Sequence, residues 1–401
     1  MLIGIFSDTH LGYGKDERYD EAFDRFDESF EMFKENNVDY ILHAGDLFDH
    51  GVPSQEVWEK TLDCFNKNKN TLTKIKKTYL GSKKEVLVRG IPVIAIHGTH
   101  EHRGKDFSNA LDVLENANAL VHVHAGHAIL EKDGEVVYIH GMGGVPEKVA
   151  KLALEKYAPI AIKDKTNLLL LHQSFKEFLP FDDDSIATLS LTDLPNGFDL
   201  IINGHLHWVN EQNIGDKRFL LTGSTIYTQM KKLESEKGKG IFLFETLTKE
   251  LKFVPFKIQR KLFYHKIKFK DAKPNEVEEE VNKVIKEIFS NEFKIKPLVR
   301  LKLTGTIAKG FLAKDIKLNI PEDDAIFSVT RKFEVESFKK KINDLKELQK
   351  QNKSIIELGI NLLENKVEEA KLVDFDTRRM FSLLSENEIE KAQIVLLKVK
   401  D

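Results

Sequence analysis

The sequence predicts an α/β domain with two sheets, followed by a small α+β domain and a helical tail. Short apolar runs alternate with amphipathic stretches in the first part of the chain, and strand-like runs dominate from about residue 119 to 256. This order of elements favours a layered α/β domain. Polar clusters also follow several of the predicted strands, at the carboxyl ends where α/β folds bind their ligands.

The first part of the chain shows the alternation most clearly. Its apolar runs have the length and branching of buried strands, and its phenylalanines recur at helical spacing. Strands are expected at 2–6, 38–44 and 91–96, and helices at 19–36, after Pro53 and Ser54, and near 107–116.

The later part is expected to form strands and then a second domain. Strands are predicted near 119–124, 135–140, 168–171, 199–202, 218–222, 240–245 and 251–256. The composition changes near 257–265, and a helix at 275–290 with strands at 298–307 and 325–333 predicts a small α+β domain. From about 334 the chain is rich in Lys and Glu with apolar residues at helical spacing.

Composition limits the class of protein. The 401 residues include 61 basic and 64 acidic side chains, a net charge of −3, so any contact with DNA must use local patches or metal ions. Cys64 is the single cysteine, which excludes an intramolecular disulfide. No apolar run approaches the roughly 20 residues that span a bilayer, and the N-terminus lacks the basic start of a signal peptide. We expect a soluble, cytoplasmic protein without a membrane partner.

The sequence FSDTH, residues 6–10, is the centre of the functional prediction. It follows the first predicted strand, and Asp8 and His10 are separated by one residue. On an extended backbone such residues point to the same side. A carboxylate and an imidazole that project together can form half of a metal site.

Four further clusters complete the pattern, each after a predicted strand. They read GD-x-x-D, G-T-H-E, a lone histidine and G-H-x-H, and their residues are Asp46, Asp49, His100, His172, His205 and His207. Imidazoles and carboxylates without thiolates suit Mn²⁺, Fe²⁺ or Zn²⁺ better than Ca²⁺. The set is too large for one tetrahedral ion, and it fits two adjacent ions of the kind that promote phosphoester hydrolysis.

The ordered motifs resemble the calcineurin-like metallophosphoesterase superfamily. FSDTHLGY, AGDLFD, HGTHE, LLLLHQS and NGHLH are together similar to its DNA-repair exonuclease branch, which contains the meiotic-recombination-eleven nuclease and its bacterial counterpart. The motifs cover about residues 1–255. The resemblance implies a four-layer α/β/β/α sandwich over 1–256, a capping domain over 257–333 and a helical partner-binding tail over 334–401.

The resemblance also implies roles for individual residues. Asp8, His10, Asp46 and His207 are expected to hold one divalent ion, and Asp46, His172 and His205 a second, with Asp46 shared and Mn²⁺ the expected metal. His100 is expected to orient the scissile phosphate or protonate the leaving oxygen, and Asp49 to hold a neighbour by hydrogen bonding. Thr99 departs from the family, which usually has Asn there as a ligand of the second ion.

The implied function is a metal-dependent DNA exonuclease or endonuclease that acts at DNA ends in double-strand-break repair. Implied partners are DNA, a second copy of the chain and a coiled-coil ABC-type ATPase subunit. Two alternatives remain open: a metallophosphoesterase for a small nucleotide or a phosphoprotein, and a scaffold with weakened catalysis, which Thr99 alone favours.

Other residues keep two interpretations each. The stretch 54–80, with Trp58, Leu62 and Phe65 followed by Lys74, Lys76 and Lys77, predicts either core packing with a solvated basic end or a homodimer helix. The remaining histidines are assigned structural roles: His43, His97, His102, His122, His124, His127, His140 and His265. Several basic residues are either DNA contacts or ordinary solvated surface: Lys83, Lys84, Arg89, Arg103 and Lys105.

Overall fold

The fold is described from a computed structural model of the whole chain. The described residues are 1–334 except 68–70, 80, 105–106 and 180–187, together with short pieces between 357 and 393. The chain divides into two compact units. The first contains residues 1–264, 293–300 and 322–327, and the second contains 265–292, 301–321 and the chain from 328 onward.

The first unit contains the two sheets that the sequence predicts. The six-stranded sheet has the order β14-β13-β1-β2-β5-β6, and the eight-stranded sheet has the order β11-β12-β10-β9-β8-β7-β3-β4. The strands of the six-stranded sheet are β1 (Leu2–Phe6), β2 (Tyr40–Ala44), β5 (Val93–Ile96), β6 (Val121–His122), β13 (Gly240–Glu245) and β14 (Leu251–Pro255). Those of the eight-stranded sheet are β3 (Leu72–Tyr79), β4 (Ser82–Arg89), β7 (Gly126–Lys132), β8 (Glu135–Met142), β9 (Thr166–Leu171), β10 (Leu200–Asn203), β11 (Asn210–Ile214) and β12 (Lys217–Leu221).

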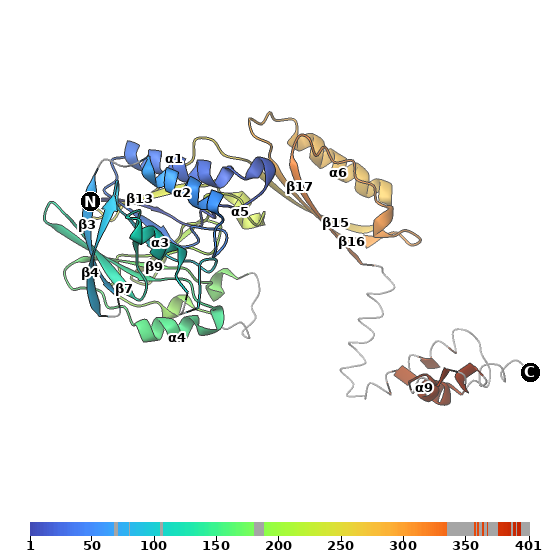
Figure 1. Cartoon of the computed structure of the whole chain (residues 1–401). Coiled ribbons are helices and arrows are strands. Elements are labelled where there is room, and N and C mark those ends of the chain that lie inside the picture. The colour runs from blue at the N-terminus through green and yellow to red at the C-terminus, as the bar shows by residue number, and fades with distance from the viewer. Residues whose placement is uncertain are drawn as a thin grey trace, which may run out of the picture. The chain divides into compact units, whose positions relative to one another are not determined.

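Helices cover the outer faces of both sheets, which gives the expected α/β/β/α layers (Figure 1). The helices of this unit are α1 (Glu21–Glu35), α2 (Gln55–Asn66), α3 (Ala110–Asn116), α4 (Glu147–Tyr157) and α5 (Lys232–Glu236). Strand β9 shows how the layers are built: Leu168 and Leu170 belong to the core between the sheets, whereas Leu169 and Leu171 pack in the core that includes α4. The period of two in a strand places alternate residues on opposite faces.

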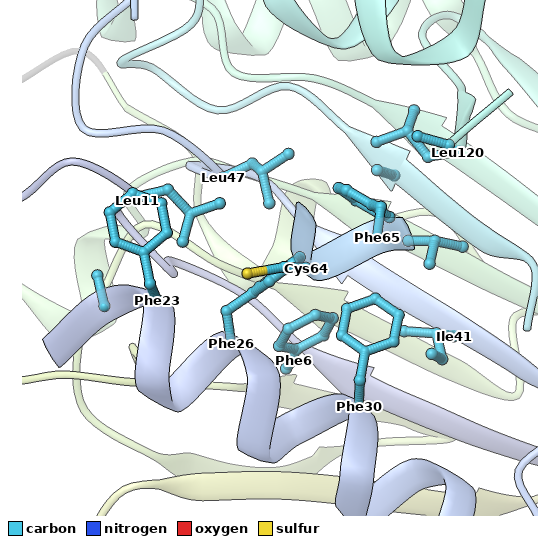
Figure 2. Packing of buried hydrophobic residues seen from close by; sticks show 14 of the residues in the cluster. Phe6, Leu11, Phe23, Phe26, Phe30, Ile41, Leu47, Cys64, Phe65 and Leu120 are labelled. Carbon is cyan, nitrogen blue, oxygen red and sulfur yellow. The ribbon is translucent and has the colours of Figure 1, made fainter. Parts of the chain in front are cut away.

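Phenylalanines fill the core between α1, α2 and the six-stranded sheet (Figure 2). Phe6 of β1 lies 5.4 Å from Phe33 of α1, measured between ring centroids. Helix α1 approaches β1 so closely that a Cβ atom on Gly4 would lie 2.4 Å from the Phe33 ring. The absence of a side chain at Gly4 therefore sets the distance between α1 and the sheet.

Several elements were not predicted. Strands β3, β4, β7 and β11 and helices α4 and α5 lie in stretches for which no element was expected, and the predicted strand near 119–124 is only two residues long. Lys74, Lys76 and Lys77 lie in strand β3. The side chains of Lys74 and Lys76 are exposed, as the prediction of a solvated basic end expects, whereas Lys77 is half-buried and pairs with Glu115.

The second unit is built on the three-stranded sheet β15-β16-β17. Its elements are β15 (Leu262–Ala272), α6 (Pro274–Ile288), β16 (Leu298–Ile307) and β17 (Ile326–Glu334), with α9 (Thr377–Ser385) in the tail. Val277 and Val281 of α6 and Leu301 and Leu303 of β16 are buried, which is typical of a helix packed on a sheet. Most of the predicted apolar tail residues, from Ile342 to Leu397, lie outside the described residues. Within the described part of the chain, no helix combines the length and apolar character needed to cross a membrane.

Candidate metal centre

The predicted site residues all follow the carboxyl ends of parallel strands. In the six-stranded sheet β1, β2 and β5 are mutually parallel neighbours, and in the eight-stranded sheet β9 and β10 run parallel. Asp8 and His10 follow β1, Asp46 and Asp49 follow β2, His100 follows β5, His172 follows β9, and His205 and His207 follow β10. Segments almost 200 residues apart in sequence therefore meet at one edge of the sandwich.

Asp8, His10 and His207 form the first group, with three ligand atoms within 4.8 Å of one another. The Nε2 atoms of His10 and His207 lie 3.2 Å apart, and His207 Nε2 lies 3.5 Å from Asp8 Oδ1. All three side chains are buried. Behind them, the Thr228 hydroxyl holds His207 Nδ1, and Asp49 Oδ1 lies 3.1 Å from His10 Nδ1.

Asp46, His172 and His205 form the second group, which meets the same distance limit. His172 Nε2 lies 3.1 Å from Asp46 Oδ2, and the rings of His172 and His205 have centroids 5.2 Å apart. The two groups are joined through Asp8, whose carboxylate accepts the backbone N–H of His205 at 3.0 Å. Asp46 belongs only to the second group, so these groupings do not include the expected sharing of Asp46 between two ions.

The backbone of the site differs from the expected geometry. Strand β1 ends at Phe6, and Asp8 and His10 have φ angles of 50° and 47°. The expectation that these residues share a side of an extended strand was therefore wrong; two left-handed residues in a turn bring them together. Asp46 and His205 are left-handed too, with φ angles of 52° and 73°. Non-glycine residues hold this conformation at a cost of about 1–3 kcal/mol each, and such residues cluster at functional sites.

The arrangement of lone pairs fits divalent ions. His172 donates its Nδ1–H to the carbonyl of Ala44 at 2.7 Å, so Nε2 carries the lone pair of the neutral ring. That atom is fully buried, faces the Asp46 carboxylate and has no hydrogen-bond partner among the described residues. His10 is similar, since a proton on Nδ1 shared with Asp49 leaves its Nε2 lone pair facing His207. Acceptors that converge in this way are stabilised by a cation between them.

Electrostatics keep the two buried aspartates ionised. Burial would raise the pKa of Asp46, but the charge of His172, 3.1 Å away, outweighs it and holds that pKa far below its usual range. The pKa of Asp8 is also lowered, because His207 and His172 overcome the effect of its burial. Without an ion, the pKa of His172 is raised to about 10, since the charges of Asp46 and Asp8 outweigh burial. The site is therefore strongly attractive to positive charge.

His100 stands at the open side of the centre. Its side chain is 42% exposed, and its Nδ1 donates to the carbonyl of Asp49 at 2.6 Å. This bond leaves Nε2 as the free nitrogen, 4.0 Å from Asp46 Oδ2. The ring also lies 4.9 Å from that of His10, and His10, Asp49 and His100 form a third close group. His100 is thus the described imidazole best placed to reach a phosphate bound at the ions.

His205 has different neighbours on its two ring nitrogens. The Thr99 hydroxyl lies 3.4 Å from Nδ1, and Glu147 Oε1 lies 3.6 Å from Nε2. Glu147 is in turn held by the Thr188 hydroxyl at 2.7 Å and the Ser174 N–H at 3.3 Å. Glu147 comes from the start of α4, and sequence reasoning missed it because no helix was expected there.

Two further residues support the centre and were not assigned a role. Glu101 is fully buried and accepts the N–H groups of Phe48 and Gly98, both at 2.6 Å, so it ties the loops after β2 and β5 together. Burial and the nearby charge of Asp46 raise its pKa to about 8. Lys239 is buried and donates to the carbonyl of His207 at 2.7 Å. The position of Glu101 next to His100 could have drawn attention to it, whereas Lys239 lies in no motif.

A family model described as "Calcineurin-like phosphoesterase" matches residues 1–209. The chain belongs to the calcineurin-like phosphoesterase family. The predicted superfamily and α/β fold class are confirmed, and the candidate ligands all lie on loops within 1–209.

Curated relatives of this calcineurin-like phosphoesterase extend beyond the matched residues. The chain is 27% identical over 335 residues to "DNA double-strand break repair protein Mre11" of Thermoplasma acidophilum, covering 80% of this chain and 81% of the relative. It is 26% identical to the protein of the same name from Sulfurisphaera tokodaii, covering 78% and 76%. A rice relative, "Double-strand break repair protein MRE11", is 25% identical over 83% of this chain and 56% of its own.

Solved structures show weaker likeness. The protein TT1561 of Thermus thermophilus has a TM-score of 0.36 and 12% identity, and covers 64% of this chain and 99% of its own. A structure titled as a novel archaeal phosphodiesterase has a TM-score of 0.31 and 15% identity, and covers 63% and 99%.

Proposed function

We propose that this calcineurin-like phosphoesterase is a metal-dependent DNA nuclease that hydrolyses phosphodiester bonds at DNA ends during double-strand-break repair. The observation that carries the proposal is the pair of adjacent Asp/His groups at one edge of the sandwich. Relatives that carry a DNA double-strand-break repair name over most of this chain support the substrate class.

The proposed ligands divide between two ions. Asp8, His10 and His207 would hold the first, and His172 and His205 would hold the second, with Asp46 shared between them. Mn²⁺ is the proposed metal, because nitrogen and carboxylate donors without thiolates suit it. When bound, such ions would supply the Lewis-acid chemistry of phosphodiester hydrolysis.

The protein's own side chains supply positioning and a proton. The hydrogen bond from His100 Nδ1 to the Asp49 carbonyl orients the ring, so that Nε2 is directed toward the open side. When the ring is protonated, Nε2–H can donate to a phosphate oxygen or give its proton to the leaving oxygen. Asp49 also holds His10, so one residue positions both a ligand and the proposed proton donor.

Cleavage assays distinguish this function from its two alternatives. The enzyme is incubated with Mn²⁺ and either single-stranded DNA, double-stranded DNA or bis-para-nitrophenyl phosphate. A DNA nuclease cleaves DNA and loses that activity in Asp8→Asn and His100→Ala. Cleavage of the small ester without DNA would support a small-substrate phosphoesterase. Inertness toward all substrates at every metal concentration would support a scaffold.

The domain assignments follow from the same proposal. We assign residues 1–256 to the nuclease domain, 257–333 to a capping domain and 334–401 to a tail that binds a coiled-coil ABC-type ATPase. A homodimer is also proposed, although Phe65 and Val57 of α2 are buried in the core, which favours core packing for that helix. Deletion of 334–401 is expected to keep the cleavage of the small ester and to abolish association with the ATPase. Retained association in a pull-down would contradict the assignment of the tail.

A further inference from the structure

A cavity that is separate from the candidate metal centre lies beside the loop that carries His100. Its volume is about 600 Å³, within the roughly 300–1,000 Å³ typical of small-ligand sites. His100 contributes its backbone N–H to Asp46 Oδ1 at 2.9 Å on the side of the metal centre. His97, His102 and Arg103 of the same loop line the cavity. The loop after β5 therefore separates the cavity from the metal centre.

The inner wall of the cavity is a chain of hydrogen-bonded histidines. Asp112 Oδ1 lies 2.7 Å from His122 Nδ1, and His122 Nε2 lies 3.0 Å from His97 Nδ1. His124 stands beside them, with its ring centroid 4.7 Å from that of His97. The N–H of Gly143 donates to His124 Nδ1 at 3.1 Å. The sequence prediction of purely structural roles did not anticipate that these imidazoles share a cavity.

These hydrogen bonds determine which nitrogens carry protons. His124 Nδ1 accepts from Gly143, so the neutral ring has its proton on Nε2. The Asp112 carboxylate accepts from His122 Nδ1–H, and His122 Nε2 shares the next hydrogen bond with His97 Nδ1. The wall thus offers a hydrogen-bond donor on His124, together with the second ring nitrogen of His97.

Burial keeps these two imidazoles neutral. It lowers the pKa of His124 to about 4, with His122 and His102 acting in the same direction. It also lowers the pKa of His97 well below the usual value, with the help of His122 and His124. Both rings are therefore uncharged at neutral pH.

The cavity has an aromatic rim. Phe107 and Tyr79 line it with side chains that are 64% and 47% exposed, far more than is usual for large rings. The Arg103 guanidinium lies over the Phe107 ring at 4.9 Å from its centroid. Exposed rings next to an arginine are typical of surfaces on which nucleic-acid bases stack.

Charge in the cavity is largely compensated, which favours an uncharged ligand. The ammonium groups of Lys77 and Lys84 both pair with Glu115, at 2.6 Å and 2.9 Å. The described groupings tight enough for a shared metal ion lie elsewhere and do not include these histidines. The walls are therefore better suited to a flat heteroaromatic ring with polar edge atoms than to a free anion or a metal ion.

We propose that this histidine-lined cavity, bounded by His97, His124 and Phe107, binds a single unstacked nucleobase of the strand held at the metal centre. The base stacks on the Phe107 ring, while its edge forms hydrogen bonds with the Nε2–H of His124 and with the imidazole of His97. The inference rests on the proposed function for its DNA substrate. It adds a base-reading pocket, and hence a sequence preference, to a centre that otherwise contacts only phosphate.

Binding of free nucleosides tests the cavity independently of cleavage. Adenosine, guanosine, cytidine and thymidine are titrated into the metal-loaded full chain, with 2-deoxyribose as a probe that has neither a base nor a phosphate. We expect saturable binding of at least one nucleoside, weakened roughly ten-fold in Phe107→Ala, the scale of one lost stacking contact. His124→Phe should weaken it similarly, because the ring remains and the donor is lost.

The control is Phe311→Ala, which removes another exposed phenyl ring, from the second unit, and should leave binding unchanged. The cavity assignment is overturned if no nucleoside binds, if 2-deoxyribose binds as tightly, or if Phe107→Ala binds like the unmodified chain. Phe107 is exposed, so this variant remains informative even if His124→Phe fails to fold.

Cleavage mapping then tests the link to the reaction. On a set of oligonucleotides, the positions cut by the unmodified enzyme should show a base preference at one position near the scissile bond. Phe107→Ala should erase it without changing hydrolysis of bis-para-nitrophenyl phosphate, and an undiminished preference would overturn the proposal. A chain that binds nucleosides and cuts no DNA would refute the proposed function and leave the cavity assignment standing.

Discussion

Thr99 is the residue at which the centre departs most clearly from its family resemblance. Its hydroxyl lies 3.4 Å from His205 Nδ1, and a neutral hydroxyl is a weaker ligand than an amide oxygen. We predict that Thr99→Asn lowers the Mn²⁺ concentration needed for half-maximal activity by about ten-fold, comparable to the effect of a hydrogen-bonding neighbour of a metal ligand. A metal titration of bis-para-nitrophenyl phosphate hydrolysis measures this. An unchanged titration curve would show that position 99 does not affect the second ion.

Glu147 is expected to support His205 from the opposite side of the ring. A carboxylate beside the second nitrogen of a ligating imidazole orients the ring and raises its basicity, and its loss typically costs 10–100-fold in metal affinity. Glu147→Gln should therefore weaken the second ion, measured by calorimetric titration of the metal-free protein. The control is Glu155→Gln, the same substitution at an exposed residue further along α4. Equal affinities in the two variants would remove Glu147 from the site.

The buried imidazole of His43 makes the stability of the protein depend on pH. It is fully buried, packs edge-on to Phe6, and has an Nδ1 atom without a described hydrogen-bond partner. Burial lowers its pKa from 6.5 to about 3, so between these values the unfolded chain binds more protons than the folded one. The contribution of neutral His43 to the free energy of unfolding is complete above pH 6.5. It is lost as the pH falls toward 3, at about 1.4 kcal/mol per pH unit.

His43→Phe removes this titration and keeps a ring in contact with Phe6. In urea unfolding of the metal-free protein between pH 4 and 7, we expect the free energy of unfolding of the variant to fall less steeply toward acid. Parallel curves for the two proteins would mean that His43 is not the group responsible.

At the scale of elements, the close contact between β1 and α1 leaves no room for a side chain at residue 4. A methyl group on Gly4 would meet the Phe33 ring at 2.4 Å, which is too close for ordinary packing. Gly4→Ala should therefore destabilise the protein by about 1–3 kcal/mol, the usual cost of overpacking a core. Phe33→Leu in the same chain should recover part of that loss, because the smaller side chain makes room. Additive losses in the double variant, measured by chemical unfolding, would contradict this account.

The predictability of each element follows from its burial. Strand β9 was predicted because both of its faces are buried, so its leucines form an unbroken apolar run. Strand β4 was not predicted, since only Val86 and Val88 are buried and its other residues are exposed. Helix α4 was missed for the same reason, with only Ala150 and Leu154 buried.

The residues of the metal centre also differ in how far the sequence predicts them. Ligand candidates such as Asp8 and His205 sit in short motifs at strand ends, so their chemistry could be read from the sequence. Their left-handed backbone could not, because non-glycine residues adopt it only when the surrounding fold enforces it. Glu147 and Lys239 reach the centre through tertiary packing, and no local pattern marks them.

At the scale of the whole molecule, the proposed ions would join the two sheets. Asp8 and Asp46 come from loops of the six-stranded sheet, whereas His172, His205 and His207 come from loops of the eight-stranded sheet. An ion bound between them has no equivalent site in the unfolded chain, so binding adds directly to the free energy of unfolding. Loss of the ion should leave buried aspartates and imidazoles that stabilise each other less well.

We therefore predict that Mn²⁺ raises the unfolding temperature of the metal-free protein. At a free Mn²⁺ concentration of 100 times the dissociation constant, each site should add about 2.7 kcal/mol to the free energy of unfolding. Scanning calorimetry with and without EDTA measures this, and Asp8→Asn and His172→Ala should each reduce the increase. Because each substitution removes a ligand from a different group, the double variant should show no increase at all. An equal increase in the double variant would mean that the ions bind elsewhere, and the proposed centre would then lose its physical basis.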